Sequence, residues 1–302
     1  MNVFITGANS FVGIELIKQL KLNPKIKIFG CDLSKNKNTN IHFIKADIRK
    51  KDIYKKLKNK IDIIIHLAAI SRDQDCSKDL YECYNTNVNG TLNMLDVANK
   101  MKVKRFIFAS TEWVYDNENA KIGVNENTKI KLDKLNSDYA KSKLISEDHC
   151  KSFYKKYDID TSIIRFGIIY GERFSNWSAV EAIFNNVRKK NSISVGSLKT
   201  SRKFIHIKDI CTGIIKTIKL KNFNVINLQG NKLISLKNII EISEKILKKK
   251  VAIEEKNPQE PSIRKVSSVI SNKKIRFKPK ISLEQGLLGL NNYLKTNLFY
   301  NK

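Results

Sequence analysis

The chain has 302 residues, of which 41% are hydrophobic and 28% are charged, proportions that are typical of a globular protein and exclude a disordered one. Its formal net charge of +28 would suit a protein that binds nucleic acid or a membrane surface. The lysines are spread along the whole chain without an arginine-rich arm, so we expect no specific nucleic-acid partner. The longest apolar stretch, 61–70, contains Asp62 and His66 and is too short to span a bilayer, so we expect no membrane partner.

The cysteines and the amino terminus indicate a cytoplasmic protein. The cysteines are odd in number, widely scattered and without a C-x-x-C pair, which favours reduced thiols over a disulfide framework: Cys31, Cys76, Cys83, Cys150 and Cys211. The first strand is expected from residue 2, which leaves no room for a targeting peptide. The four histidines show no metal-ligand spacing, so we expect no metal.

Strand-like apolar runs alternate with amphipathic stretches through about residue 170. The predicted strands are 2–6, 26–31, 41–45, 61–67, 104–109 and 160–166, and the predicted helices are 12–21, 52–59, 79–101 and 137–156. Strands that alternate with helices indicate an α/β fold with a doubly wound, Rossmann-like parallel sheet. Ligands bind such a sheet at the carboxyl ends of its strands.

The pattern loosens in the second half of the chain. Two more segments, 203–207 and 224–228, are predicted to return to the sheet, and a last helix is predicted at 282–295. We therefore expect a dinucleotide-binding domain at 1–171, with returns near 203–230. The rest, 172–202 and 231–302, should form a smaller, mostly helical C-terminal lobe that binds substrate over a cleft.

The first thirteen residues predict a phosphate-binding turn between a strand and a helix. Gly7 would allow the tight turn, and Gly13 would let the helix pack closely on the strand. Ser10 stands where the usual fingerprint has its middle glycine. The backbone N–H groups at such a helix start point toward one place and suit a pyrophosphate, so we expect Ser10, Phe11 and Val12 to contact a dinucleotide.

A carboxylate follows at the end of the second predicted strand. Asp32 lies about 20 residues past the glycines, where a dinucleotide site binds the adenosine ribose hydroxyls. A carboxylate there would repel a 2′-phosphate, which favours NAD over NADP. The nearby Lys35 and Lys37 leave NADP open.

Three side chains further along could carry acid–base chemistry. Tyr139 and Lys143 are four residues apart in one predicted helix and therefore share a face. An ammonium close to a phenol favours the phenolate, so we expect Lys143 to lower the pKa of Tyr139 from about 10 toward the working pH. Tyr139 would then be a general acid and base, and Lys143 could hydrogen-bond a nicotinamide ribose. Thr111, just past a predicted strand, could contact the same substrate oxygen.

Further motifs connect these features in order along the chain. They are Thr6-Gly7-Ala8-x-x-Phe11-Val12-Gly13, Asp32, Ala46-Asp47-Ile48, His66-Leu67-Ala68-Ala69, Asn87-Val88-x-Gly90-Thr91, Ser110-Thr111-x-x-Val114-Tyr115, Tyr139-x-x-x-Lys143, Arg165 to Tyr170-Gly171 and Arg202-Lys203-Phe204-Ile205-His206-Ile207-x-Asp209. The sequence resembles the extended short-chain dehydrogenase/reductases, the NAD-dependent nucleotide-sugar epimerase/dehydratase family, over essentially its full length. The motifs identify neither the sugar nor the nucleotide.

The resemblance implies roles for residues that the pattern alone does not assign. Asp47 and Ile48 would flank the adenine of NAD, and Leu67, Ala68 and Ala69 would line the cofactor. Other members of the site would be Asn87, which would organise the active-site backbone or contact the cofactor ribose, and the catalytic trio of Thr111, Tyr139 and Lys143.

Three residues would meet the substrate by the same resemblance. Arg202 would hold the nucleotide diphosphate through charge-assisted hydrogen bonds, and Arg264 would be a second such residue. Glu112 could assist if chemistry at C5 or C6 of the sugar follows. Helices 79–101 and 137–156 would pair across a two-fold axis in a homodimer.

The favoured function is a nucleotide-sugar 4-epimerase. Tyr139 would take a proton from the C4 hydroxyl while NAD accepts the C4 hydride, and the 4-keto sugar would turn before the hydride returns to its other face. A 4,6-dehydratase and a 4-keto-sugar reductase of the same family are alternatives. Dehydratases of the family typically have two acidic residues after the threonine, and this chain has only Glu112, which lowers the dehydratase reading. Trp113 is an aromatic residue before the valine, a feature that also occurs in the 4-keto-sugar reductases. A non-catalytic NAD-sensing or RNA-associated protein is a less favoured reading, because Thr111, Tyr139 and Lys143 are all present.

Overall fold

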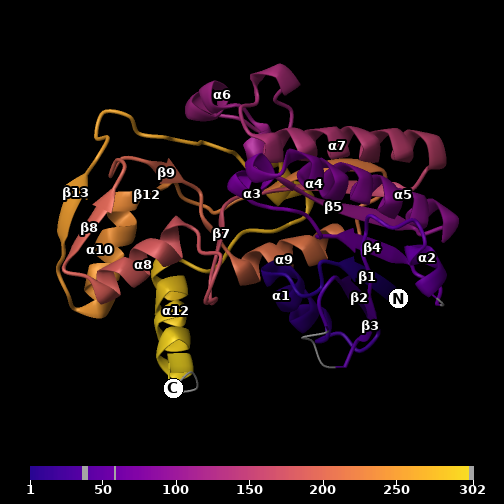
Figure 1. Cartoon of the computed structure of the whole chain (residues 1–302), viewed down its shortest axis with the longest axis horizontal. Coiled ribbons are helices and arrows are strands. Elements are labelled where there is room, and N and C mark those ends of the chain that lie inside the picture. Colours follow the sequence, from indigo (N-terminus) through magenta and orange to yellow (C-terminus); the bar gives the residue numbers. More distant parts are fainter. Residues whose placement is uncertain (36–39, 58, 299–302) are drawn as a thin grey trace.

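A seven-stranded parallel sheet forms the centre of the computed structural model, which describes residues 1–35, 40–57 and 59–298 (Figure 1). Its strand order is β11-β6-β5-β4-β1-β2-β3, and all neighbouring pairs run parallel. The strands are β1 Asn2–Thr6, β2 Lys27–Asp32, β3 His42–Lys45, β4 Ile63–His66, β5 Arg105–Thr111, β6 Asp160–Phe166 and β11 Phe223–Leu228. The order reverses between β1 and β4, which opens a crevice at the carboxyl ends of these strands.

Helices cover both faces of this sheet, as the doubly wound prediction requires. Residues that alternate along β1 enter two different cores, with Val3 and Ile5 on one face and Phe4 on the other. Helices α1 (Phe11–Leu20) and α9 (Ile207–Thr217) pack together on the first face. Helices α5 (Gly90–Lys100) and α7 (Asp138–Tyr157) cover the second, which is the upper one in Figure 1.

The predicted elements of the first half are confirmed within one or two residues, with two exceptions. The predicted helix 79–101 is wrong as a single helix, because a π-helical turn at Asn85–Asn89 separates α4 (Leu80–Tyr84) from α5. The predicted helix 52–59 shortens to α2 (Ile53–Lys56), and its residue 58 lies outside the described residues.

The second half returns to the sheet once, through β11. The predicted return at 203–207 is wrong, because β10 (Ile205–His206) pairs with β7 (Ile169–Tyr170) in a separate two-stranded sheet. The backbone then enters α9 directly, since His206 accepts a hydrogen bond at the helix start from the amide of Lys208.

The remaining segments form a separate core to the left of the sheet in Figure 1. Helices α8 (Ala179–Lys189), α10 (Leu236–Leu247) and α12 (Leu283–Leu298) supply most of its buried side chains. Short strand pairs accompany them: β8 (Ser192–Val195) with β13 (Ala252–Glu255), and β9 (Ser201–Arg202) with β12 (Ile234–Ser235). The division into a dinucleotide-binding domain and a substrate lobe stays a prediction.

The expectation of reduced thiols throughout is wrong for one pair. Cys76 and Cys83 form a disulfide between the short helix α3 (Asp73–Lys78) and α4. No pattern in the sequence indicates this disulfide, because the pairing depends on how the chain turns between the two helices. Cys31, Cys150 and Cys211 are free and buried, as expected.

Four further short helices complete the described chain: η2 (Glu112–Val114), α6 (Asn117–Ile122), η3 (Leu132–Lys134) and α11 (Val269–Lys274). Within residues 1–35, 40–57 and 59–298, no helix has the length and apolar character needed to cross a membrane.

Candidate active site

A cavity of about 1470 Å³ runs along the carboxyl ends of β1, β2, β4 and β5. Most of the predicted cofactor and catalytic residues line it: Gly7, Ser10, Phe11, Val12, Asp32, Asp47, Ile48, Leu67, Ala68, Ala69, Thr111, Tyr139 and Lys143. Gly13, Asn87, Glu112, Arg202 and Arg264 do not line it. The structure thus brings most of the predicted cofactor and catalytic residues to one cavity and leaves three of the four predicted substrate residues, Glu112, Arg202 and Arg264, outside its walls, while their roles stay predictions.

The turn after β1 has the geometry of an anion site. Gly7 has a φ of +69°, and a Cβ at Gly13 would lie 2.3 Å from the carbonyl oxygen of Gly7. Neither position therefore tolerates a side chain. Ser10 needs no glycine, because its φ is −69° and its hydroxyl caps α1 by accepting from Gly13 N at 3.0 Å. The first amides of α1 have no partner within the helix and point at the cavity end where an anion would lie.

Two carboxylates stand at the far end of the same cavity. Asp32 at the end of β2 accepts hydrogen bonds from the backbone amides of Asn9 at 3.0 Å and Ser34 at 3.3 Å. Asp47 accepts a two-pronged hydrogen bond from Arg49, which lowers the pKa of its carboxyl. Carboxylates at this place suit the ribose and adenine groups of a dinucleotide. Lys37, which left NADP open, lies outside the described residues.

The predicted catalytic trio meets where β5 ends against the start of α7. The hydroxyl of Thr111 lies close enough to Tyr139 to favour its phenolate form and lower its pKa. Lys143, one helical turn on, donates from Nζ to the carbonyl oxygen of Ala109 at 2.8 Å and lies 4.7 Å from the ring centroid of Phe108. Helical spacing and the strand end thus bring the three side chains to one part of the cavity wall.

The expected lowering of the tyrosine pKa is absent. Burial raises the pKa of Tyr139 to about 12, against a smaller opposing effect of the Thr111 hydrogen bond. Burial also lowers the pKa of Lys143 to about 8, because a charged ammonium is poorly solvated there. The sequence pattern gave the spacing of the pair but could not give the desolvation that both groups undergo.

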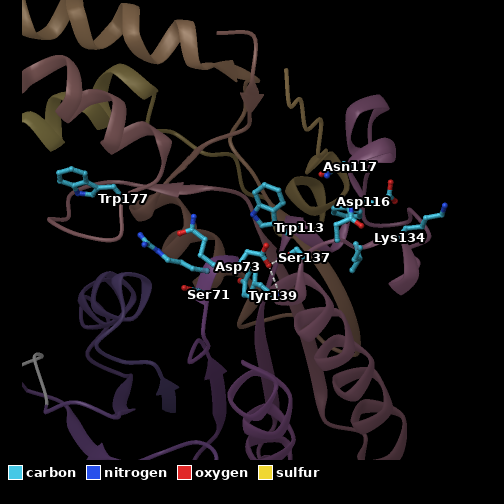
Figure 2. A pocket seen from close by; sticks show the side chains of 14 residues that line it. Ser71, Asp73, Trp113, Asp116, Asn117, Lys134, Ser137, Tyr139 and Trp177 are labelled. Atoms are coloured by element: carbon cyan, nitrogen blue, oxygen red, sulfur yellow. Dashed lines mark hydrogen bonds between the residues drawn. The ribbon is translucent and has the colours of Figure 1, made fainter. Parts of the chain in front are cut away.

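A second cavity of about 580 Å³ adjoins Tyr139 (Figure 2). Its walls come from the segments after β4 and β5, the start of α7 and the segment before α8: Ser71, Arg72, Asp73, Gln74, Trp113, Tyr115, Asp116, Asn117, Lys134, Leu135, Asn136, Ser137, Tyr139 and Trp177. Trp113 and Tyr139 line both cavities. A ligand that reached across them would therefore pass the tyrosine hydroxyl.

Glu112 points away from both cavities into a buried cluster. Its side chain is 1% exposed, and burial raises the pKa of its carboxyl. The amide of Gln229 donates to Oε2 at 2.8 Å, and Arg264 Nε lies 3.9 Å from Oε1. The carboxylate therefore belongs to a protein-internal ion pair.

The two predicted diphosphate residues are also turned inward. Arg264, which is 1% exposed, donates to the carbonyl oxygens of Glu112 and Tyr115 and to the side chain of Asn117. Arg202 donates to the carbonyl oxygen and hydroxyl of Ser262, and its buried Nε has no hydrogen-bond partner in the described chain. The buried Nε of Arg264 likewise has no hydrogen-bond partner among the described residues, so each arginine keeps one donor that fits a further acceptor.

Asn87 organises the backbone beside the trio, as one of its two expected roles requires. Its amide exchanges hydrogen bonds with both backbone groups of Ile70, at 2.8 and 3.0 Å, and donates to Ser142 of α7 at 2.9 Å. Cys76 and Cys83 lie within 4.0 Å of the same amide nitrogen. The loop after β4 is thus tied to the helix that carries Tyr139.

Asp73 is a residue that the sequence analysis missed. Its Oδ1 accepts from Ser137 Oγ at 2.6 Å and from Tyr139 N at 3.3 Å, at the first turn of α7 (Figure 2). Ser137 is itself the helix cap. The Ser-x-Tyr start of α7 was readable, but its carboxylate partner lies 64 residues earlier and no local pattern connects the two.

A buried ion pair supports the trio from behind. Arg165 of β6 donates to both oxygens of Glu147 of α7, at 3.0 and 2.6 Å. Ser110 Oγ donates to the same carboxylate at 2.5 Å, so the hydroxyl of Ser110 is engaged with the protein interior although the residue, like Thr111, lines the larger cavity.

The chain was compared with known proteins. Residues 3–228 match the family model described as the NAD dependent epimerase/dehydratase family. A putative UDP-glucose 4-epimerase of Methanocaldococcus jannaschii is 28% identical over 98% of this chain and 99% of its own length. A UDP-glucuronate 4-epimerase of Thermodesulfobacterium geofontis is 28% identical over 87% of this chain and 82% of its own. The crystal structure of a UDP-glucuronic acid 4-epimerase from Bacillus cereus, in complex with UDP-glucuronic acid and NAD, is similar with a TM-score of 0.86 and 26% identity, over 98% of this chain and 99% of that one.

Proposed function

Because the chain belongs to the NAD-dependent epimerase/dehydratase family, we propose that it is a nucleotide-sugar 4-epimerase that acts by transient oxidation of the sugar at C4. The observation that carries the proposal is the convergence of Thr111, Tyr139 and Lys143 on one wall of a cavity whose other end is the glycine turn. Two of the relatives that match most of its length carry 4-epimerase names, which supports the same activity.

The residues of the larger cavity fit NAD. The close approach at Gly7 and Gly13, where a Cβ would collide with backbone, leaves room for a pyrophosphate at the start of α1. Asp32 at the end of β2 supplies an acceptor for ribose hydroxyls and repels a 2′-phosphate, which supports NAD over NADP. Bound NAD supplies a reversible hydride acceptor for the sugar carbon.

The side chains then divide the proton chemistry between them. Tyr139 accepts the proton of the C4 hydroxyl, and Thr111, which lies beside Tyr139 on the cavity wall, steadies the same oxygen as it becomes a carbonyl. Lys143 with a pKa of about 8 is a cation for much of the neutral range, and its charge stabilises the phenolate when Tyr139 gives up its proton. Since burial holds the tyrosine pKa near 12, substrate and cofactor must supply part of the driving force.

The position of Glu112 favours epimerisation over dehydration. Water elimination needs an acid and a base that reach C5 and C6, in addition to the tyrosine. Glu112 is 1% exposed, paired with Gln229 and Arg264, and absent from the walls of both cavities. No step of the proposed reaction uses it.

A substrate panel tests the proposal. Purified protein, with and without added NAD, is incubated with UDP-, GDP-, dTDP- and CDP-hexoses, and products are identified by NMR. We expect one substrate to give its 4-epimer with no net change in NADH. A 4-keto-6-deoxy product would establish a dehydratase, and stoichiometric consumption of NADH with a 4-keto sugar would establish a reductase.

The homodimer and the lack of specific nucleic-acid binding stay predictions. Light scattering on the purified protein measures the mass in solution, with a value near twice 34.8 kDa expected. Nucleic-acid binding at physiological salt is expected to be micromolar or weaker and to fall steeply with added salt, which is the behaviour of non-specific contacts.

A further inference from the structure

Trp113 is an aromatic side chain in the middle of the site with no role so far. It lines both cavities, it is partly exposed, and it follows Thr111 by two residues. Its backbone amide donates to the Thr111 hydroxyl at 3.3 Å, so its position is fixed relative to the catalytic trio. Figure 2 shows it close to Tyr139, where a sugar whose C4 hydroxyl meets the phenol would lie.

The ring of Trp113 is supported by two buried cations. The guanidinium carbon of Arg264 lies 4.7 Å from the ring centroid, and that of Arg202 lies 5.7 Å from it. Such contacts stabilise an aromatic face, more strongly where the cation is desolvated as here. Burial lowers the pKa of both guanidinium groups, which measures that desolvation.

Arg264 in turn is fixed by the segment that carries the tryptophan. It donates to the carbonyl oxygens of Glu112 and Tyr115, on either side of Trp113, and to Asn117. Glu112 lies beside it as a buried counter-charge. These hydrogen bonds use the two terminal nitrogens of Arg264, so its guanidinium group supports the η2 turn that carries Trp113.

From this arrangement we propose that Trp113 is a stacking platform for the hexose ring of the substrate, and that Arg264 is its positioning residue. The inference rests on the proposed function. An indole face presents no fixed hydrogen-bond partner, so it attracts the C–H face of a pyranose without holding one rotational setting. Such a wall suits a 4-keto sugar that must turn in place, and it makes the sugar, rather than the nucleotide, the part recognised by Trp113.

The chain provides a direct optical test, because Trp113 and Trp177 are its only tryptophans. In a Trp177→Phe variant the fluorescence comes from Trp113 alone, and in Trp113→Phe it comes from Trp177 alone. Both lie on the smaller cavity, but Figure 2 shows Trp177 well apart from Trp113 and Tyr139. NAD-loaded protein is titrated with UDP and with UDP-glucose, in a Tyr139→Phe background that prevents turnover. We expect UDP-glucose to change the Trp113 emission more than UDP does; equal responses would overturn the proposal.

Binding constants give an independent readout. In the same background, Trp113→Ala is expected to raise the Kd for UDP-glucose about threefold to tenfold while leaving the Kd for UDP within about twofold. Trp113→Phe, which keeps a ring, should restore part of the difference. Phe174→Ala is the matched control, because Phe174 is an exposed aromatic that lines the larger cavity only and should weaken UDP-glucose and UDP alike.

The same assay distinguishes a positioning role of Arg264 from direct binding of the diphosphate. Arg264→Met should reproduce the selective loss for UDP-glucose and shift the Trp113 emission of the free enzyme. Equal losses of affinity for UDP and UDP-glucose would assign Arg264 to the diphosphate and overturn its positioning role. If Arg264→Met does not fold, the Kd values of Trp113→Ala, measured with Arg264 intact, still test the stacking role of Trp113. An unchanged ratio of the two Kd values in Trp113→Ala, while the protein that retains Tyr139 does epimerise a UDP-sugar, overturns the inference alone. If the protein binds neither UDP nor UDP-glucose and also epimerises no UDP-sugar, the proposed function fails first.

Discussion

We predict that the buried ammonium group of Lys143 lowers the free energy of unfolding of the protein. Burial lowers its pKa from the ordinary 10.5 to about 8, so the folded chain releases this proton more readily than the unfolded chain. Between pH 8 and pH 10.5 the unfolded state therefore binds more protons, and folding stability rises with pH. Below pH 8 both states are protonated, and the whole penalty of the buried ammonium remains.

The size of the penalty follows from the pKa difference. At about 1.4 kcal/mol per pH unit, the shift corresponds to about 3 kcal/mol at pH 7 and, with the folded side chain mostly neutral, to about 2 kcal/mol at pH 9. A Lys143→Met variant keeps the length of the side chain and removes the titration. Its loss of the Ala109 hydrogen bond lowers its stability by a similar amount at both pH values, so that loss cancels in the difference.

The assay is urea unfolding of wild type and Lys143→Met at pH 7 and pH 9, without added NAD, followed by far-UV circular dichroism. Relative to the variant, the wild type should gain about 1 kcal/mol between pH 7 and pH 9. Lys141→Met is a matched control, because Lys141 lies on the same helix in a partly exposed ion pair with Asp138 and is not fully buried as Lys143 is. A stability difference that stays constant, or that moves against the wild type as pH rises, would refute the reasoning.

Three further predictions follow from single contacts. Gly13→Ala should weaken NAD binding at least about tenfold, because its Cβ would meet the carbonyl oxygen of Gly7, whereas Gly196→Ala, with nothing within 4 Å, should leave NAD binding unchanged; isothermal titration measures both. Arg165→Met should lower the free energy of unfolding by about 3–5 kcal/mol, since it leaves Glu147 charged and unpaired in the interior, and a loss below about 1 kcal/mol in urea unfolding would contradict the buried ion pair. Glu112→Gln should keep epimerase turnover within about tenfold; a loss of a hundredfold or more would mean that the carboxyl takes part in acid–base catalysis.

The sequence predicted the sheet and the cofactor end of the site because their signals are local. A strand, a glycine turn and a capped helix occupy the first twenty residues, and the four-residue spacing of Tyr139 and Lys143 already places them on one helical face. The π-helical turn at Asn85–Asn89 left no such trace, because the amphipathic pattern continues through it.

What the sequence could not give depends on partners far along the chain. Arg264 reads as a cation available for phosphate until Glu112 and Tyr115, about 150 residues earlier, are seen to accept its hydrogen bonds. The raised pKa of Tyr139 likewise comes from burial by the whole fold, and spacing to Lys143 says nothing about it. The disulfide of Cys76 and Cys83 depends on the loop after β4 in the same way.

In the proposed reaction, the C4 hydrogen leaves the sugar and returns to the same carbon while the sugar stays bound in the active site. The most direct measurement uses UDP-hexose deuterated at C4, converted by NAD-loaded enzyme in ordinary water, with the product examined by NMR and mass spectrometry. We expect a 4-epimer that retains the deuterium at C4, and no product when Tyr139 is replaced by Phe. A product with hydrogen at C4, or with the deuterium moved to C6, would contradict it.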